Sequence, residues 1–279
     1  MIRLSAFADE ISPDLNGQIA TLQREGIRYL DLRSMWNINV LDLSDGQIGQ
    51  IKYALDEHGI SVAAIGSPLG KTPIDSPFEA TMQKLERAIE VAQAFDTPFI
   101  RIFSFYPPTH PHLVSTRAGT NRDEVMRRLH VMIERARSAN VTLLHENEKD
   151  IYGDTIDHCV DLMRTCANEH FQAVFDPANF IQCAQIPYPN AYDALHPWLS
   201  YIHVKDALPD GSVVAAGEGA TRWPDLLQHL RNDGYDGFFS LEPHLAAAGQ
   251  FRGFSGPDLF VRASQALKRL LQEMDWKYE

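Results

Sequence analysis

The sequence predicts a single α/β domain in which eight parallel strands close into a (β/α)8 TIM barrel surrounded by helices. Short runs rich in β-branched and aromatic residues alternate with longer amphipathic stretches, the pattern of repeated strand and helix units. Eight such runs are present, and eight strands are the number that closes a barrel of this kind. The chain of 279 residues has no low-complexity tract or Ser/Gly-rich linker, so we expect residues 1–279 to form one domain.

The predicted strands are the short apolar runs, and each is followed by a segment long enough to hold a helix or a long loop. We expect them near residues 3–8, 28–33, 60–66, 98–104, 141–147, 171–176, 200–205 and 237–243. In a parallel barrel the carboxyl ends of all strands meet at one mouth, where the following loops build the active site. Chemistry-bearing residues at these ends are therefore the first candidates for function.

Helix signals lie between the strands. Ser44 with Gln47 resembles a capping box, and the helix that it opens should end at Gly59. Apolar residues at helical spacing over 258–275 predict a closing outer helix.

A second start of the capping-box kind, Asn121 with Glu124, predicts a helix over 122–139.

Three long segments should cover the mouth: SFYPPTHPHLVSTRAGT after the fourth strand, ALPDGSVVAAGEG after the seventh, and HLAAAGQFRGFSGP after the eighth. The Asp-Gly pair in the second of them favours a small hairpin.

The charge and composition of the chain disfavour some classes of binding partner. Lys plus Arg number 25 and Asp plus Glu 37, and the resulting net charge of −12 disfavours nucleic acid and acidic membrane surfaces. Charged residues interrupt the N-terminus before a signal-peptide core could form, and no run reaches transmembrane length, so we expect a cytoplasmic protein with no membrane partner. Cys159, Cys166 and Cys183 form no CxxC pattern and are expected to be buried, reduced thiols.

A metal site is predicted from four residues near strand ends, namely Glu146, Asp176, His203 and Glu242. Three carboxylates and one imidazole suit Mn²⁺, Co²⁺, Mg²⁺ or Zn²⁺ rather than a soft thiophilic metal. Any one acid at a strand end is more often a helix cap or a solvated loop residue. The joint pattern on four strand ends favours one divalent metal ion, and the alternative is a purely structural cluster.

Further polar residues near the same ends could bind substrate hydroxyls or a phosphate: Arg101, Asn147, Lys205 and His244, with Arg33 a weaker candidate. Lys205 fits equally well as a solvated charge at the rim. Glu148 is a rival of Glu146, because both would share a face if the strand continued. No phosphate-cradling glycine loop is evident, so a phosphorylated substrate is not assumed.

Several motifs together resemble the sugar phosphate isomerase/epimerase family, the xylose isomerase-like barrels that include ketose 3-epimerases and inosose dehydratases. They are LLHENEKDIYGDT, FDPANF, YIHVKDA, GEGATRWPDLL and GYDGFFSLEPH, and the resemblance runs from FADEISPDL through the final helix. It implies that Glu146, Asp176, His203 and Glu242 hold the metal. One departure is Asn179, which stands where many epimerases carry His; it implies a substrate contact with a different sugar preference.

The resemblance also implies a reaction and a partner. Glu146 and Glu242 would act as acid and base in proton abstraction α to a carbonyl through an enediolate, on a small carbohydrate substrate. Epimerisation, aldose–ketose isomerisation and dehydration all remain open. An endonuclease IV-like hydrolase is disfavoured by Asn179 and by the net charge, and a non-catalytic sugar-binding barrel is a further alternative. Related barrels commonly pair, so a homo-oligomer is possible.

Overall fold

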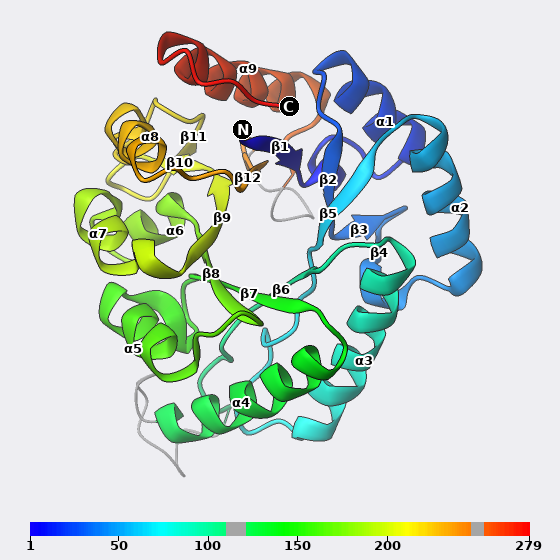
Figure 1. The fold of residues 1–279 in the computed structure, drawn as a ribbon, viewed down its shortest axis with the longest axis vertical. Helices are drawn as coiled ribbons and strands as arrows, with labels where there is room; N and C mark the ends of the chain where they lie inside the picture. The colour runs from blue at the N-terminus through cyan, green and yellow to red at the C-terminus, as the bar shows by residue number, and fades with distance from the viewer. Residues whose placement is uncertain (110–120, 247–253) are drawn as a thin grey trace.

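The computed structural model describes residues 1–109, 121–246 and 254–279 and contains the predicted barrel. Its eight strands are all parallel and follow the hydrogen-bonded order β1-β12-β9-β8-β7-β6-β5-β2. Figure 1 shows the helices as a ring around these strands. The strands are β1 (Arg3–Ala6), β2 (Tyr29–Leu32), β5 (Ser61–Ile65), β6 (Phe99–Ile102), β7 (Thr142–Glu146), β8 (Phe171–Phe175), β9 (Leu199–Val204) and β12 (Phe238–Leu241). Each overlaps a predicted strand, so the predicted fold is confirmed.

The barrel has one seam. β1 and β2 stand at the two ends of the hydrogen-bonded order, and no backbone ladder joins them in the described residues. All seven other neighbouring pairs are parallel ladders. The barrel is therefore nearly closed, and side chains must complete the seam.

Nine α-helices are present in the described residues: α1 (Leu15–Arg24), α2 (Asp45–Glu57), α3 (Phe78–Ala94), α4 (Arg122–Ser138), α5 (Ile156–Cys166), α6 (Pro177–Gln182), α7 (Tyr192–Leu195), α8 (Trp223–Asn232) and α9 (Pro257–Glu273). Apolar faces of these helices pack on the strands and form one large buried core. The predicted capping box is present, because Ser44 accepts from the Gln47 amide while the Gln47 side chain accepts from Ser44. Gly59 follows α2 with a φ of +63°.

The start of α4 differs from the prediction. The helix is present, but Asn121 makes no side-chain cap hydrogen bond. Glu124 does not reach back to it and instead pairs with Arg127 and Arg128, each at 2.7 Å. These two charge-assisted contacts hold the glutamate on the helix surface, so the predicted capping box was wrong here.

Two small hairpins stand beside the barrel. The predicted one pairs β10 (Asp206–Ala207) with β11 (Val213–Val214). The second pairs β3 (Ser34–Met35) with β4 (Ile38–Asn39) through Trp36 and Asn37, which both have positive φ. Tryptophan is an unusual residue for such a turn, so this hairpin could not be predicted from turn residues. The predicted mouth segments after the fourth and eighth strands lie partly outside the described residues.

Cysteine placement and helix composition add two further observations. Cys159 and Cys166 are buried, Cys183 is partly buried, and all three are free thiols. None of the helices in the described part of the chain is both long enough and apolar enough to span a bilayer.

Gly70 supports a first prediction on stability. The Gly70 carbonyl accepts a hydrogen bond from the backbone amide of Phe105, in the segment after β6, at 2.9 Å. Gly70 has a φ of +85°, and an added Cβ would overlap the Phe103 carbonyl group. Gly70→Ala should lower the free energy of unfolding by about 3 kcal/mol, the combined cost of left-handed backbone strain and a steric overlap.

Gly26→Ala is the matched control, because Gly26 has a φ of +63° but no atom near the added Cβ. Its cost should be only the backbone strain of about 1 kcal/mol. Urea unfolding of both variants measures the difference. Equal losses would show that the contact with Phe103 relaxes without cost.

Candidate active site

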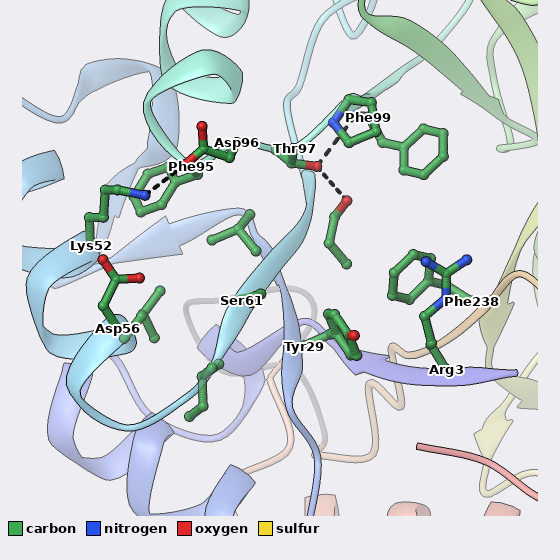
Figure 2. A pocket seen from close by; sticks show the side chains of 15 residues that line it. Arg3, Tyr29, Lys52, Asp56, Ser61, Phe95, Asp96, Thr97, Phe99 and Phe238 are labelled. Atoms are coloured by element: carbon green, nitrogen blue, oxygen red, sulfur yellow. Dashed lines mark hydrogen bonds and ion pairs between the residues drawn. The ribbon is translucent and has the colours of Figure 1, made fainter.

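A cavity of about 810 Å³ opens at the carboxyl end of the barrel. Its lining includes eight residues singled out from the sequence, namely Arg33, Arg101, Glu146, Glu148, Asn179, Lys205, Glu242 and His244. A smaller cavity of about 310 Å³ lies at the opposite end, beside the first residues of several strands (Figure 2). There Lys52 pairs with Asp96 at 3.0 Å, and none of the predicted site residues lines it. The candidate functional residues therefore lie together at the mouth of the barrel and not at its opposite end.

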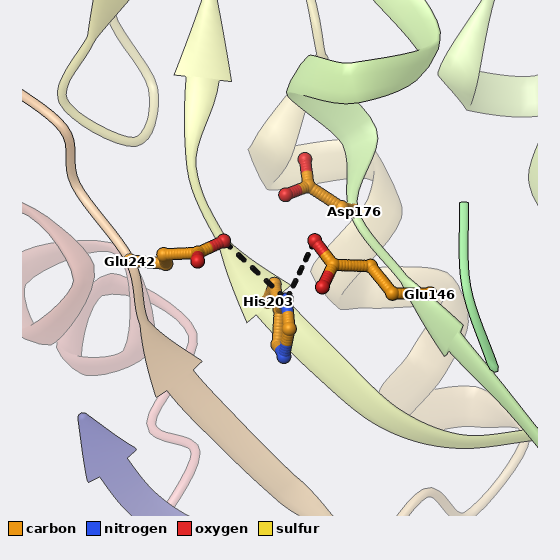
Figure 3. A group of neighbouring side chains, drawn as sticks. All are labelled: Glu146, Asp176, His203 and Glu242. Atoms are coloured by element: carbon orange, nitrogen blue, oxygen red, sulfur yellow. Dashed lines mark ion pairs between the residues drawn. The ribbon is translucent and has the colours of Figure 1, made fainter. Parts of the chain in front are cut away.

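The four predicted metal ligands converge there, as Figure 3 shows. Glu146 ends β7, Asp176 directly follows β8, His203 lies within β9, and Glu242 directly follows β12. One potential ligand atom from each lies within 4.8 Å of the others, and all four residues are buried. His203 Nδ1 is 3.3 Å from Glu146 Oε1 and 3.5 Å from Glu242 Oε2. Four strands far apart in sequence thus supply one compact donor set.

Strand register explains part of this convergence. β9 and β12 pair with His203 opposite Ser240, so Glu242 emerges just beyond the histidine. β7 and β8 pair with Glu146 opposite Val174, two residues before Asp176. Inward-facing positions alternate along each strand, so the four side chains reach the mouth from adjacent levels of the barrel.

Asp176 serves two roles at once. Its Oδ1 accepts from the Asn179 amide at 2.9 Å and caps α6. The cap predicted as the ordinary alternative for such an acid is therefore real, but it occupies only one oxygen. Asp176 Oδ2 lies 2.7 Å from Lys205 Nζ without an aligned hydrogen bond and faces the other ligand candidates.

The electrostatics of the cluster are strongly coupled. Burial disfavours ionisation of Glu146, but His203 and Arg101 outweigh it and lower its pKa to about 2. The pKa of Glu242 falls well below its ordinary value, because Lys205 and His244 outweigh burial. Burial raises the pKa of Asp176 to about 6 against the opposing effect of Lys205. His203 is buried, but Glu146 and Glu242 raise its pKa to about 10.

The donor set fits a divalent cation. Asp176 Oδ2 and His203 Nδ1 are both buried and make no aligned hydrogen bond. Their nearest charged neighbours are Lys205 Nζ, 2.7 Å from Asp176 Oδ2, and the two glutamate carboxylates beside His203. Buried polar atoms normally make well-aligned hydrogen bonds, so the lack of one at both atoms favours a ligand site over a purely structural cluster. Three carboxylate groups and one imidazole are ligands that a divalent metal accepts. A cation bound among them would satisfy both atoms.

Two buried cations flank the carboxylates. Arg101 Nη1 lies 3.1 Å from Glu146 Oε2 and 3.5 Å from Glu242 Oε1, and its Nη2 donates to the Gly66 carbonyl at 3.1 Å. Lys205 Nζ lies 3.4 Å from Glu242 Oε2. Burial lowers the pKa of Lys205, but four surrounding acids outweigh it and raise the pKa above its ordinary value: Asp176, Glu242, Glu146 and Glu148. Lys205 is only 4% exposed, so it is not the solvated rim charge considered above.

The two asparagines differ in placement. Asn147 was expected to contact substrate, but its side chain binds the backbone of Asp176 on both sides: Nδ2 donates to the carbonyl and Oδ1 accepts from the amide, each at 2.9 Å. It does not line the cavity. Asn179 does line it, and its Nδ2 donates to Glu146 Oε1 at 3.2 Å. Asn147 thus braces a ligand residue, whereas Asn179 contacts one from within the cavity.

His244 lies at the edge of the cavity, close to Arg33, which was only a weak candidate, and to Glu10 and Phe7, which were not predicted. His244 Nε2 lies 3.1 Å from Glu10 Oε1 and 3.6 Å from Glu242 Oε1, and these acids raise its pKa to about 9 against burial. Arg33 Nη1 is 3.0 Å from Glu242 Oε1. Glu10 is fully buried, and the Phe7 ring meets His203 edge-on at 5.1 Å. The segment after β1 contains apolar and acidic residues, but no spacing rule connects it to Glu242.

Glu148, the rival of Glu146, lines the cavity but lies apart from the four converging residues. Its Oε2 pairs with Lys71 Nζ at 2.9 Å. The alternative placement of the metal ligand at this position therefore has no geometric support.

Comparisons with known proteins agree with this architecture. A family model described as xylose isomerase-like TIM barrel matches residues 19–271. No curated protein sequence matches significantly. A D-tagatose 3-epimerase-like protein has a TM-score of 0.77 and 17% identity over 98% of this chain and 98% of its own. A probable 3-DHS dehydratase from Bacillus anthracis has a TM-score of 0.73 and 17% identity over 96% and 99%. A xylose isomerase-like protein from Mycobacterium smegmatis, in complex with magnesium, has a TM-score of 0.69 and 18% identity over 97% of each chain. At these identities the structural likeness establishes the fold alone.

Proposed function

Because the chain belongs to the xylose isomerase-like TIM barrel family, we propose that it is a metal-dependent isomerase or epimerase of a small sugar, polyol or keto-sugar. The observation that carries the proposal is the convergence of four side chains at the barrel mouth, two of whose buried ligand atoms make no aligned hydrogen bond: Glu146, Asp176, His203 and Glu242. The epimerase-like structural neighbour supports a carbohydrate substrate.

Glu146, Asp176, His203 and Glu242 would hold one divalent cation. When bound, such a cation would act as a Lewis acid toward the carbonyl of a hydroxyketone. Magnesium in one structural neighbour supports a cation at this site, and the donor set suits Mn²⁺, Co²⁺ and Zn²⁺ as well. Asn147 would position Asp176 through its two backbone hydrogen bonds.

Glu146 and Glu242 are the proposed acid and base. Their carboxylates lie on two sides of His203 (Figure 3). The lowered pKa of each keeps it ionised near neutral pH, as a proton acceptor must be. One carboxylate would remove the proton on the carbon beside the carbonyl, giving an enediolate. The first carboxylate would release its proton to solvent, and a solvent proton relayed by the other carboxylate to the opposite face would invert that centre.

The remaining cavity residues would bind the substrate. Arg101, Asn179, Lys205 and His244 all line the cavity and present hydrogen-bond donors or a cationic group beside the carboxylates. The net charge of −12 makes nucleic acid an unfavourable partner. A cytoplasmic location and assembly of two copies remain predictions.

Dehydration is the second candidate reaction, favoured by the likeness to a dehydratase. The same proton abstraction followed by loss of a β-hydroxyl would give it. Deuterium wash-in separates the candidates: ketoses and inososes are incubated in D₂O with Mn²⁺, and the labelled carbon and the product mass are determined. Deuterium in an unchanged or epimeric sugar indicates epimerisation, deuterium at the neighbouring carbon isomerisation, and loss of water dehydration. If the metal-loaded protein exchanges no proton of any of them, the proposal gives way to a non-catalytic sugar-binding barrel.

A further inference from the structure

A buried aspartate lies inside the barrel below the site. Asp31 on β2 is 2% exposed and accepts hydrogen bonds from three hydroxyl groups. Tyr201 Oη donates to Oδ1 at 2.6 Å, Ser5 Oγ donates to Oδ2 at 3.2 Å, and Ser240 Oγ donates to the same oxygen. The four residues come from four different strands, so one carboxylate ties β1, β2, β9 and β12 together.

One of these bonds crosses the open seam. Ser5 belongs to β1 and Asp31 to β2, the two strands that no backbone ladder joins in the described residues. Ser5 lies opposite Ser240 in the β1–β12 ladder, and Ser240 lies opposite His203 in the β12–β9 ladder. The side-chain contact therefore completes the ring of strands next to a candidate metal ligand.

The other two bonds reach the strands that carry ligands. Tyr201 precedes His203 by two positions, and Ser240 precedes Glu242 by two positions. Residues two apart share a face of a strand, so both donors point into the barrel below the ligand that follows them. Asp31 thus anchors β9 and β12 one level below the mouth.

A buried aspartate inside the barrel is energetically unfavourable. In the described part of the chain no lysine, arginine or histidine nitrogen lies within ion-pair distance of Asp31, and burial raises its pKa against the three donors. Apolar side chains usually fill the interior of such barrels at lower cost. Three hydroxyl donors directed at its two oxygens stabilise the carboxylate form, and a cation held among the four ligands would stabilise it further.

We propose that Asp31 is a positioning residue of the metal centre. Through Tyr201 and Ser240 it holds β9 and β12 so that His203 and Glu242 present their ligand atoms together, and its charge favours a cation above it. The inference rests on the proposed function, because it requires that a cation bind the four ligands.

Cobalt binding tests it without any substrate. The protein is titrated with Co²⁺, and both the dissociation constant and the visible absorption band of the bound ion are recorded. Asp31→Asn keeps the size of the side chain and removes its charge. Its Co²⁺ dissociation constant should rise about 10-fold, the lower end of the effect of losing a group hydrogen-bonded to a metal ligand, because Asp31 acts through Tyr201 and Ser240. The band should shift or change intensity.

Asp206→Asn is the matched control, because Asp206 is also fully buried and accepts hydrogen bonds from Ala207 and from the segment between β11 and α8, at Gly217, Gly219 and Thr221. It should lower the melting temperature and leave the cobalt affinity and band as in the wild type. If Asp31→Asn does not fold, Tyr201→Phe replaces it, since it cuts the tie to β9 and keeps the charge; a weaker Co²⁺ affinity is again expected.

The outcomes separate the two proposals. Wild-type affinity and an unchanged band in Asp31→Asn, or in Tyr201→Phe where the first variant is unfolded, would overturn the role of Asp31 alone. A wild-type protein that binds no Co²⁺ would overturn both this role and the metal-dependent function.

Discussion

Replacing Glu242 by glutamine should reduce deuterium wash-in by about a thousandfold or more, the scale of a lost general acid or base. An amide cannot take the proton from carbon, and it also removes the charge around which Arg33, Arg101 and Lys205 gather. Glu146→Gln should have an effect of the same order, because Glu146 contacts the same Arg101 and His203. NMR of the sugar in D₂O measures the exchange rate, and thermal unfolding shows whether the barrel persists.

Glu148→Gln is the control for both variants. Glu148 lines the same cavity and carries the same charge, but its ion-pair partner is Lys71 rather than one of the four converging residues. The variant should lose at most about fivefold in exchange rate, the equivalent of ~1 kcal/mol for a partly exposed ion pair. A loss as large as that of Glu146→Gln would mean that Glu148 performs the chemistry assigned here to Glu146.

The barrel could be predicted because its signal is local. Each strand is a short apolar run between longer amphipathic stretches, and eight such units have few ways to pack. The predictions that were wrong concern local contacts, which depend on competition among side chains. Asn121 does not cap α4 because Glu124 pairs with Arg127 and Arg128 instead. The seam between β1 and β2 was not predictable either, since it depends on how the barrel closes.

Four site residues could be proposed from sequence because the carboxyl ends of parallel strands meet at one mouth. Glu10 and Phe7 were missed, because only barrel closure brings the segment after β1 beside Glu242 and His203. The substrate contact predicted for Asn147 was wrong, and the alternation of side chains along a strand explains why. It directly follows Glu146, so its side chain is directed away from the cavity and reaches the backbone of Asp176.

The affinity for a divalent cation should rise steeply with pH. In the metal-free protein Glu146 and Glu242 outweigh burial and raise the pKa of His203 to about 10, so the imidazole is protonated at neutral pH. A cation needs the neutral ring and must displace that proton, so below the raised pKa binding strengthens as pH increases. The logarithm of the affinity should gain about one unit per pH unit, one proton being released per cation. Burial raises the pKa of Asp176 to about 6, so a second proton is released below that pH and the slope steepens.

Isothermal titration calorimetry at neutral pH, in two buffers of different ionisation enthalpy, counts the released protons. His203→Asn should weaken binding and remove the slope above pH 6, because the displaced proton resides on the imidazole, whereas Glu148→Gln should keep the wild-type slope. A pH-independent affinity in the wild type would mean that the cation does not use His203.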